Sequence, residues 1–503
     1  MSLAGWIERN AAFAPAKPAI CIEDREVTYA ALSEAIERLA AGLHHALGLR
    51  RGDRIAHLGH NSVEFITLVF ACARLGVILV PLNWRLAVPE HQAILANAEP
   101  MVLCADAAFR EHAEKLREET ASLRPICTDL AVTGWPSLEE IAAAGSPAPP
   151  VEGAGRDPLL IVYTSGTTGE PKGAVLTQDA LFWNAVNSIH MHDLTSTDHV
   201  LTVLPLFHVG GLNIQTLPAL HAGATVTLLR RFEPGATLAA IGSGRPTLTV
   251  LVPATMRAVI DHPAWASTDL SSLRMITTGS QIVPVELIEM FHDRGVPVIQ
   301  VYGATETAPI AVYQRREDAL RTPGSSGKVA LHCELRIVDD ADKDVAPGER
   351  GEVLVRGPNV MSEYWRNPAA TAAALRDGWF HTGDIGHLDT QGDLWIDARK
   401  DDLIKSGGER IYPAEIEDIL RTLPGVRDVA VIGRPDPHWG EVPVAVVCAG
   451  PDGQPTRDQL IGALEGRVAR FKHPKDVIFV EEMPRNALGK VQRFRLRAKL
   501  RAG

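Results

Sequence analysis

A short run rich in glycine and hydroxyl side chains places the strongest constraint on this chain of 503 residues. It spans residues 163–173, reads Tyr-Thr-Ser-Gly-Thr-Thr-Gly-Glu-Pro-Lys-Gly, and lies between two apolar segments. Glycines let a backbone turn sharply and approach a ligand, while hydroxyl and N–H groups suit a polyphosphate. Residues 159–163 predict a buried strand, and Thr177 can cap a helix that starts near Asp179. The order of strand, phosphate loop and helix therefore predicts a nucleotide site.

Two other nucleotide motifs do not fit the chain. A Walker A loop needs Gly-Lys followed directly by Ser or Thr, whereas Lys172 is followed by Gly173. No Gly-x-Gly-x-x-Gly follows a predicted strand, so a dinucleotide-binding fold has no support. The remaining alternative is a flexible surface loop, and the order of the residues in 163–173 argues against it.

Composition and charge exclude several classes of protein. Apolar residues make up 46% and charged residues 22% of the chain, which is typical of a soluble globular protein. The net charge of -11 argues against a nucleic-acid binder. No secretory signal is recognisable at the N-terminus, and the six cysteines show no paired spacing, so we expect reduced thiols and a cytoplasmic location. The length predicts at least two domains.

The longest apolar stretch, Ile66 to Leu82, contains Arg74 and Gly76. A core helix followed by a core strand explains this stretch better than a membrane span, so we expect no integral membrane segment. No Cys/His spacing typical of zinc sites is present.

Helical and strand patterns alternate through most of the chain and predict an α/β fold. Examples are an amphipathic helix over 32–47 and a strand over 77–81. Strand patterns dominate the sequence over residues 327–397. After the charged run 398–402, residues 403–503 form an α+β pattern, with a helix over 413–421 and a strand over 429–432. We therefore place a domain boundary at 398–402.

Four further runs carry residues suited to nucleotide chemistry. They are Val301 to Thr307 with Glu306, Gly378 to Asp384, Ala398 to Glu409, and Pro484 to Val491 with Lys490. A carboxylate beside a triphosphate can hold Mg²⁺, and an aspartate can accept both ribose hydroxyls. Taken singly, Glu306 is better explained as an exposed loop carboxylate, Asp384 as a turn former and Lys490 as a solvated lysine.

All five runs together resemble, in order and spacing, the motifs of the adenylate-forming superfamily of acyl-CoA synthetases, nonribosomal adenylation domains and luciferases. The resemblance spans residues 163–490 and is strongest to bacterial fatty-acyl-CoA synthetases. It implies a large N-terminal domain (1–397) of αβ-layered sheets with a small β-barrel-like subdomain. It also implies a hinge (398–402) and a small mobile α+β domain (403–503). Two departures are Gly279-Ser280-Gln281, where the family usually has Gly-Gly-Ala, and Ala398 before Arg399, where it has glycine.

The resemblance assigns many of these residues to ATP. The residues that would wrap the β- and γ-phosphates are Thr164, Ser165, Gly166, Thr167, Thr168, Gly169 and Lys172. Gly279, Ser280 and Gln281 would lie along the edge of the adenine and Tyr302 would stack on the base. Val301, Gly303 and Ala304 are further residues expected to bind the cofactor. Asp384 would hold the ribose hydroxyls with help from Arg399, and Ile396 is a further residue expected to bind the cofactor.

The resemblance also assigns the catalytic roles. Thr305 would contact the α-phosphate, Glu306 would bind Mg²⁺, and Lys490 would bridge the substrate carboxylate and the α-phosphate. His208 would lie at the mouth of the acyl pocket. A turn of the C-terminal domain about Asp401 would then bring in the cofactor-binding residues of the CoA step: Ser406, Gly407 and Gly408.

The implied activity is an acid–thiol ligase that uses ATP, Mg²⁺ and CoA, first forming an acyl-adenylate with release of pyrophosphate. The segments that would line the acyl pocket, 205–215 and 303–313, carry no charged side chain apart from His208 and Glu306. A second carboxylate on the substrate would need an arginine there, so we expect an apolar monocarboxylic acid. A medium- or long-chain fatty acid is the main expectation, and an aryl or cinnamate-type acid is the alternative.

Two other classes remain as alternatives. A carrier-protein adenylation enzyme would need a thiolation domain or a docking segment, and a non-catalytic regulator would not need Lys490 or Glu306. The expected partners are therefore small molecules (the acid, ATP and CoA), without nucleic acid, and a homodimer is one option for the assembly.

Overall fold

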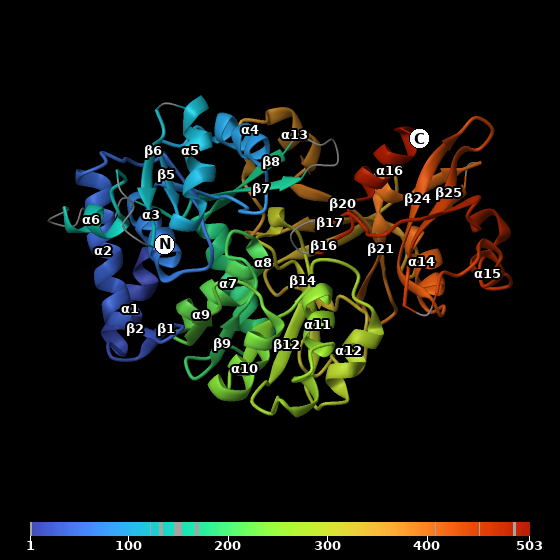
Figure 1. The fold of residues 1–503 in the computed structure, drawn as a ribbon, viewed down its shortest axis with the longest axis horizontal. Coiled ribbons are helices and arrows are strands. Elements are labelled where there is room, and N and C mark those ends of the chain that lie inside the picture. Colours follow the sequence, from blue (N-terminus) through green and yellow to red (C-terminus); the bar gives the residue numbers. More distant parts are fainter. Residues whose placement is uncertain are drawn as a thin grey trace. The chain divides into compact units, whose positions relative to one another are not determined.

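The computed structural model describes residues 3–120, 122–129, 134–144, 153–165, 171–407, 409–451, 453–485 and 489–502 (Figure 1). Its contacts divide the chain into two compact units. The first contains Met1–Leu335 and Val355–His381, and the second contains Arg336–Leu354 and Thr382–Gly503. The predicted hinge 398–402 lies inside the second unit, and its role as a hinge stays a prediction.

The largest sheet of the first unit has nine strands and is parallel through its centre. Its strand order is β15 (Lys328–Val329), β14 (Val312–Tyr313), β13 (Val298–Tyr302), β12 (Met275–Gly279), β11 (Leu248–Val250), β9 (His199–Thr202), β10 (Thr225–Leu228), β1 (Pro18–Ile22) and β2 (Arg25–Thr28). The carboxyl ends of parallel strands meet at one edge, so the runs that follow β12 and β13 are brought together there.

A second sheet of the first unit has seven strands. Its order is β18 (Glu363–Tyr364), β8 (Pro171–Thr177), β7 (Pro158–Ser165), β4 (Ile78–Pro81), β3 (Arg54–Leu58), β5 (Val102–Ala105) and β6 (Arg124–Cys127). Side chains alternate between its two faces: Ile55 joins one hydrophobic cluster and Ala56 joins another. Both faces of this sheet are therefore buried.

Two smaller sheets complete the described strands. One has the order β16 (Glu334–Val338), β17 (Gly351–Arg356), β20 (Trp379–Leu388) and β19 (Leu375–Arg376), with β21 (Leu394–Arg399) also paired to β20. The other, in the second unit, has the order β23 (Glu409–Ile411), β22 (Ile404–Ser406), β25 (Gly440–Ala449) and β24 (Val426–Asp436), with β26 (Asp476–Phe479) paired to β25.

Helices cover the sheets. The α-helices of the first unit are α1 (Ala4–Phe13), α2 (Tyr29–His45), α3 (Val63–Leu75), α4 (Val88–Ala98), α5 (Arg110–Glu119), α6 (Leu138–Ala143), α7 (Gln178–His192), α8 (Val209–Gly211), α9 (Leu217–Ala222), α10 (Pro234–Gly244), α11 (Pro253–Ile260), α12 (Val285–His292) and α13 (Pro368–Ala374). Its short turns are η1 (Ala107–Phe109), the π-helical turn η2 (Leu212–Thr216), η3 (Trp265–Ser267) and η4 (Thr305–Thr307). The second unit has α14 (Pro413–Arg421), α15 (Arg457–Gly462), α16 (Arg493–Ala502), η5 (Lys400–Asp402) and η6 (Arg470–Lys472).

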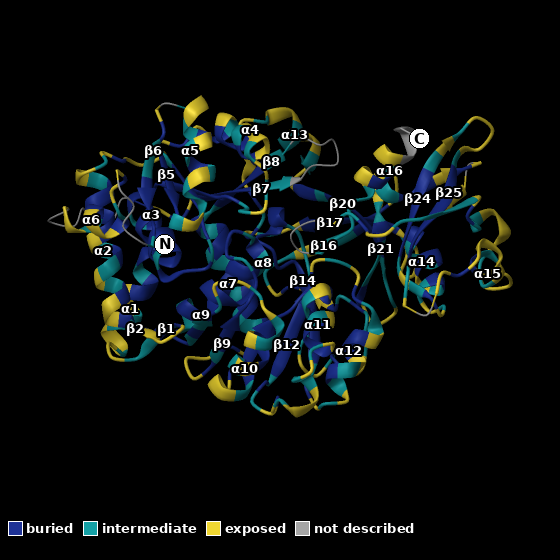
Figure 2. Ribbon diagram, viewed as in Figure 1, coloured by how far each residue is buried: buried dark blue, intermediate teal, exposed yellow. Residues whose placement is uncertain are grey.

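Buried residues concentrate on the strands and on the inner sides of the helices, as Figure 2 shows. Helix α3 packs against β4 and β7 on one face of the seven-stranded sheet, while α4 and α5 contribute to the cluster on the other. The second unit has separate clusters around β24 and β25. Each unit therefore has its own hydrophobic core.

Most of the elements predicted from the sequence are present. The apolar stretch Ile66 to Leu82 is the end of α3 followed by β4, and the helix over 413–421 is α14. No helix in the described ranges has both the length and the apolar character that a bilayer span requires. The six cysteines are free thiols, with Cys21 and Cys333 only partly buried.

The helix predicted near Asp179 is present as α7, but a strand that the sequence analysis did not predict lies between the phosphate loop and this helix. Residues Pro171–Thr177, which include Lys172, form β8, and β8 pairs antiparallel with β7, so the loop connects the two strands of a hairpin. Helix α7 begins only after β8, where the Thr177 hydroxyl accepts a hydrogen bond from Ala180 N as predicted. Pairing with β7 decided this, because an apolar run of that length fits a strand or a buried helix equally well.

Candidate active site

The ends of the phosphate hairpin lie directly opposite each other. Thr164 pairs with Lys172 in the strand register, and the Thr164 hydroxyl lies 3.5 Å from the Lys172 carbonyl oxygen. Ser165 pairs with Pro171. The predicted phosphate residues Gly166, Thr167, Thr168 and Gly169 lie outside the described residues.

The predicted Mg²⁺ ligand, Glu306, is buried in the short turn η4 that follows β13. Its Oε1 accepts a hydrogen bond of 2.7 Å from the Tyr364 hydroxyl, and its carbonyl accepts one from Met361 N. The predicted α-phosphate residue Thr305 is also buried in this turn. A carboxylate held in this way is oriented before a ligand arrives.

Tyr364 is a site residue that sequence reasoning missed. Besides holding Glu306, its ring lies 5.6 Å from Lys172 Nζ, within the range of a cation–π contact. Tyr364 reaches this position because β18 pairs antiparallel with β8. It therefore connects the predicted metal carboxylate to the predicted phosphate lysine, although almost 200 residues separate it from that lysine.

We expect Tyr364→Phe to raise the Mg²⁺ concentration for half-maximal activity about tenfold, because Glu306 loses the hydrogen bond that orients it. Activity titrated with MgCl₂ at fixed ATP measures this. Tyr29→Phe is the matched control, because it also removes a tyrosine hydroxyl from the first unit, one that donates to the Ala224 carbonyl. An unchanged Mg²⁺ requirement in Tyr364→Phe would contradict this role.

The predicted adenine-edge residues lie side by side at the ends of β12 and β13. Gly279 pairs with Val301, and a Cβ at Gly279 would collide with the Val301 carbonyl oxygen. A Cβ at Gly303 would likewise meet the carbonyl of Pro309. Ser280 takes a left-handed conformation (φ 75°). Close backbone packing therefore explains both glycines.

The other adenine residues complete this edge. Tyr302, the predicted stacking residue, ends β13 and is half-buried, and Ala304 precedes η4. Ala304 N donates to the Thr307 hydroxyl at 2.9 Å, which fixes the turn. Gln281 is half-buried just after Ser280.

His208 lies at the start of the predicted acid-binding segment. Its Nδ1 accepts a hydrogen bond from Gly210 N at 3.1 Å, so the imidazole caps α8. Burial lowers the pKa of His208 to about 4, which makes the ring neutral at pH 7. The chain then continues through η2 into α9.

In the second unit, the predicted ribose residues are joined by an ion pair. Asp384 on β20 lies opposite Arg399 on β21, and Arg399 Nη1 donates to Asp384 Oδ1 at 2.7 Å. Ile396, on the same strand, pairs with Gly386. Lys490 belongs to this environment: burial and the nearby Arg399 lower its pKa, while Asp384 opposes that shift.

The predicted CoA residues are near a tight turn between β22 and β23. Gly407 is left-handed (φ 58°) and donates its N–H to the Trp439 carbonyl at 2.8 Å. A Cβ there would approach the Trp439 ring to 2.8 Å, so only glycine fits without a shift. Ser406 is buried beside it, whereas Gly408 lies outside the described residues.

The donor set of the first unit fits a metal that arrives with ATP. No group of three or more His, Cys, Asp or Glu side chains suited to a metal occurs among the residues with described positions. Mg²⁺ is usually bound through one or two carboxylates plus substrate phosphates, rather than in an all-protein cage. A single oriented carboxylate such as Glu306 meets that requirement.

Comparison with known proteins gives the family. The model of the AMP-binding enzyme family matches residues 7–365, and that of the AMP-binding enzyme C-terminal domain matches residues 415–490. Indoleacetate–CoA ligase of Aromatoleum aromaticum is 52% identical over 495 residues, which are 98% of this chain and 97% of that protein. Feruloyl-CoA synthase of an Amycolatopsis species is 41% identical over 98% of both proteins.

The fold agrees with this assignment. The solved structure of Mycobacterium tuberculosis fatty acyl CoA synthetase superposes with a TM-score of 0.80 at 34% identity, covering 100% of this chain and 98% of that one. The mixed α/β fold, with a large N-terminal and a small C-terminal domain, is thereby confirmed, as are the predicted enzyme class and its use of ATP, Mg²⁺ and CoA. The chain belongs to the AMP-binding enzyme family and is an ATP-dependent acid–CoA ligase.

Proposed function

We propose that this ligase activates an aromatic acid of the indoleacetate type. The observation that carries the proposal is the 52% identity, over nearly the full length of both chains, to a protein named indoleacetate–CoA ligase. Similarity to a feruloyl-CoA synthase at 41% favours the same class. The comparisons therefore favour the aryl alternative over the fatty acid that the sequence analysis preferred.

A buried amide in the predicted acid-binding segment supports this choice. Asn213 lies in η2 and is 1% exposed, and neither its Oδ1 nor its Nδ2 has a hydrogen-bond partner within the part of the chain that the structure describes. Leaving such a group unpaired costs about 1–3 kcal/mol. A ring N–H or ring hydroxyl on the acid could pair with it, whereas an alkyl chain could not.

The chemistry proceeds in two half-reactions. A carboxylate oxygen of the acid attacks the α-phosphorus of ATP, the bond to the β-phosphate oxygen breaks, and pyrophosphate leaves. The thiolate of CoA then attacks the acyl carbon, forming the thioester and releasing AMP. Two anions meet in the first step, so preorganised positive charge lowers its barrier.

The proposed roles follow from that requirement. Lys490 balances charge at the substrate carboxylate and the α-phosphate, and Lys172 does so at the outer phosphates. Asp384, oriented by Arg399, accepts the ribose hydroxyls. Mg²⁺, which Glu306 is proposed to hold, supplies further positive charge to the phosphates. Which acid is activated depends on the residues around η2.

A substrate panel tests the proposal. Purified enzyme with ATP, Mg²⁺ and CoA is given indole-3-acetate, 1-naphthaleneacetate, ferulate, decanoate and palmitate, and AMP and thioester are measured. We expect kcat/KM for indole-3-acetate to exceed that for the fatty acids at least about tenfold. The naphthalene acid, which has similar size but no ring N–H, should fall between them because it leaves Asn213 unpaired. A higher kcat/KM for decanoate or palmitate would overturn the aryl assignment.

A further inference from the structure

Helix α7 presents a row of polar side chains to the protein interior. Asn184, Asn187, Ser188 and His192 are all buried, and their spacing of three, four and eight residues places them along one side of the helix. A buried polar side chain is costly unless it forms hydrogen bonds. The hydrogen-bond partners of these side chains therefore indicate which segments helix α7 holds in place.

The row holds backbone of the two predicted acid-binding segments. Asn184 Nδ2 donates to the Asn213 carbonyl at 2.7 Å, and its Oδ1 accepts from Ile310 N at 3.0 Å. The Ser188 hydroxyl donates to the Ile214 carbonyl at 2.6 Å. Two carbonyls of η2 are thus bound by side chains of α7, and the 303–313 segment is tied to the same helix.

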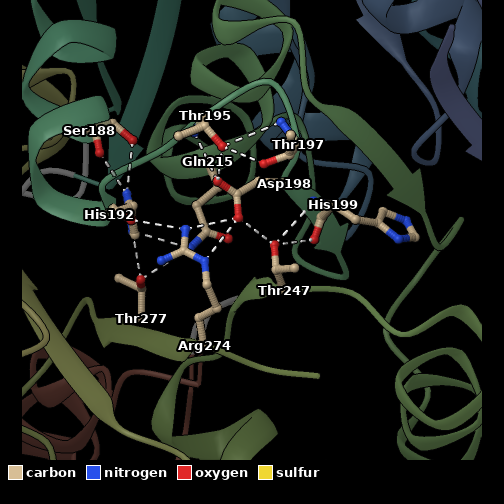
Figure 3. A network of polar contacts seen from close by, with 10 residues as sticks. All are labelled: Ser188, His192, Thr195, Thr197, Asp198, His199, Gln215, Thr247, Arg274 and Thr277. Carbon is tan, nitrogen blue, oxygen red and sulfur yellow. Dashed lines mark hydrogen bonds and ion pairs between the residues drawn. The ribbon is translucent and has the colours of Figure 1, made fainter. Parts of the chain in front are cut away.

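His192 is the junction of this network, as Figure 3 shows. Its Nδ1 lies 2.8 Å from the Ser188 carbonyl, which can only accept, so Nδ1 carries the proton. Its Nε2 is then free to accept from the Thr277 hydroxyl at 2.8 Å and from Gln215 Nε2 at 3.1 Å. Burial lowers the pKa of His192 to about 4, which agrees with a neutral ring.

The far side of His192 is fixed as well. Its carbonyl accepts a hydrogen bond from Arg274 Nη2, and Arg274 is paired with buried Asp198 at 2.9 Å. Asp198 in turn accepts from the Thr247 hydroxyl (Figure 3). The backbone of His192 is therefore held by Arg274, and its imidazole Nε2 is held by Thr277 and Gln215.

Those two partners belong to different functional segments. Gln215 is in η2, within the predicted acid-binding segment, and Thr277 is in β12, two residues before the predicted adenine residue Gly279. Gln215 Nε2 also donates to the Thr277 hydroxyl at 3.1 Å, which closes a triangle with the imidazole. His192 thus connects the turn beside the acid to the strand that leads to the nucleotide.

We propose that His192 is a positioning residue for the acid: it holds η2 against β12 and so sets where Asn213 and Gln215 meet the substrate. The proposal rests on the proposed function only in placing the acid beside η2. It assigns His192 no contact with ATP and no proton transfer.

Two substitutions of similar size separate this role from simple packing. In His192→Gln the side-chain amide can place an acceptor near the position of Nε2 and keep the bonds to Thr277 and Gln215. In His192→Asn the amide reaches only the position of Nδ1 and loses them. We expect His192→Asn to raise KM for the acid about tenfold, with KM for ATP nearly unchanged, and His192→Gln to stay near the parent.

The control and the acid are chosen to keep the outcomes distinct. His199→Gln changes another histidine that bonds a threonine hydroxyl, Thr227, without reaching η2, and should leave KM for the acid unchanged. Measurements use whichever acid of the panel gives the highest kcat/KM. If the His192 variants do not change KM for the acid, the aryl assignment still stands. If the enzyme prefers a fatty acid, the role of His192 can still be tested with that acid.

Equal values of KM for the acid in His192→Asn and His192→Gln would overturn the proposal, as would an equal rise in KM for ATP. If neither variant folds, Thr277→Val and Thr277→Ser provide the same comparison, because only serine keeps the hydroxyl that bonds Nε2. KM for the acid should then rise several-fold in the valine variant alone.

Discussion

Lys490→Ala is expected to slow acyl-adenylate formation about 10²–10³-fold, because the two reacting anions lose a preorganised positive charge. ATP–pyrophosphate exchange in the presence of the acid measures this half-reaction alone. Thioester formation from chemically prepared acyl-adenylate should be affected much less, since that step has no entering phosphate anion. The variant should therefore separate the two half-reactions.

Lys475→Ala is the matched control. Lys475 is an exposed lysine of the same unit, and its recorded hydrogen bonds are made by its backbone, so removing its charge should leave both half-reactions unchanged. Adenylation at the parental rate in Lys490→Ala would disprove the central role of this lysine.

The pH dependence provides a second check on Lys490. Its pKa is lowered from the usual 10.5, chiefly by burial. The protonated form carries the charge, so adenylation should decline with rising pH earlier than an ordinary lysine would allow. In Lys490→Arg this alkaline loss should disappear, because guanidinium keeps its proton.

If the proposed hinge is correct, Asp401→Pro should leave adenylation within about threefold of the parent and slow thioester formation about 10²-fold, because the backbone at Asp401 could no longer turn. Proline fixes φ near −65° at position 401, so the backbone there cannot take up a second conformation. Single-turnover measurement of each half-reaction distinguishes the two effects.

The residues on both sides of the proposed hinge at Asp401 are held by ion pairs. On one side, Arg399 is bound to Asp384 and Lys400 to Glu352. On the other side, Asp402 is bound to Arg497 at 3.0 Å, which ties it to α16. The Asp401 carbonyl also accepts a hydrogen bond from Arg497 at 3.1 Å, so a turn at the proposed hinge would have to break that bond.

Asp401→Ala is the control for this experiment. It removes the exposed carboxylate but leaves the backbone free to rotate, so both half-reactions should proceed normally. If Asp401→Pro formed adenylate and thioester at parental rates, a hinge at Asp401 would be excluded.

The sequence was sufficient to predict the elements with strong local patterns and the chemistry of the motifs. The apolar stretch Ile66 to Leu82, the cap at Thr177 and the helix over 413–421 carry their own signals, and the structure contains each of them. The five motifs predicted the family, which the family models and the relatives confirm. The sequence motifs did not determine which acid is activated, because a pocket segment without charged side chains suits a fatty acid and an aryl acid alike.

Only the tertiary structure decided which distant residues meet. Tyr364 reaches Glu306 through the pairing of β18 with β8, and His192 reaches Gln215 and Thr277 through the packing of α7. Strand β8, which includes Lys172, forms because β7 is available to pair with it. Local sequence determines caps, periodicity and motif chemistry within a few residues. Contacts across 20 to 200 residues depend on how whole elements pack, and no local pattern records that.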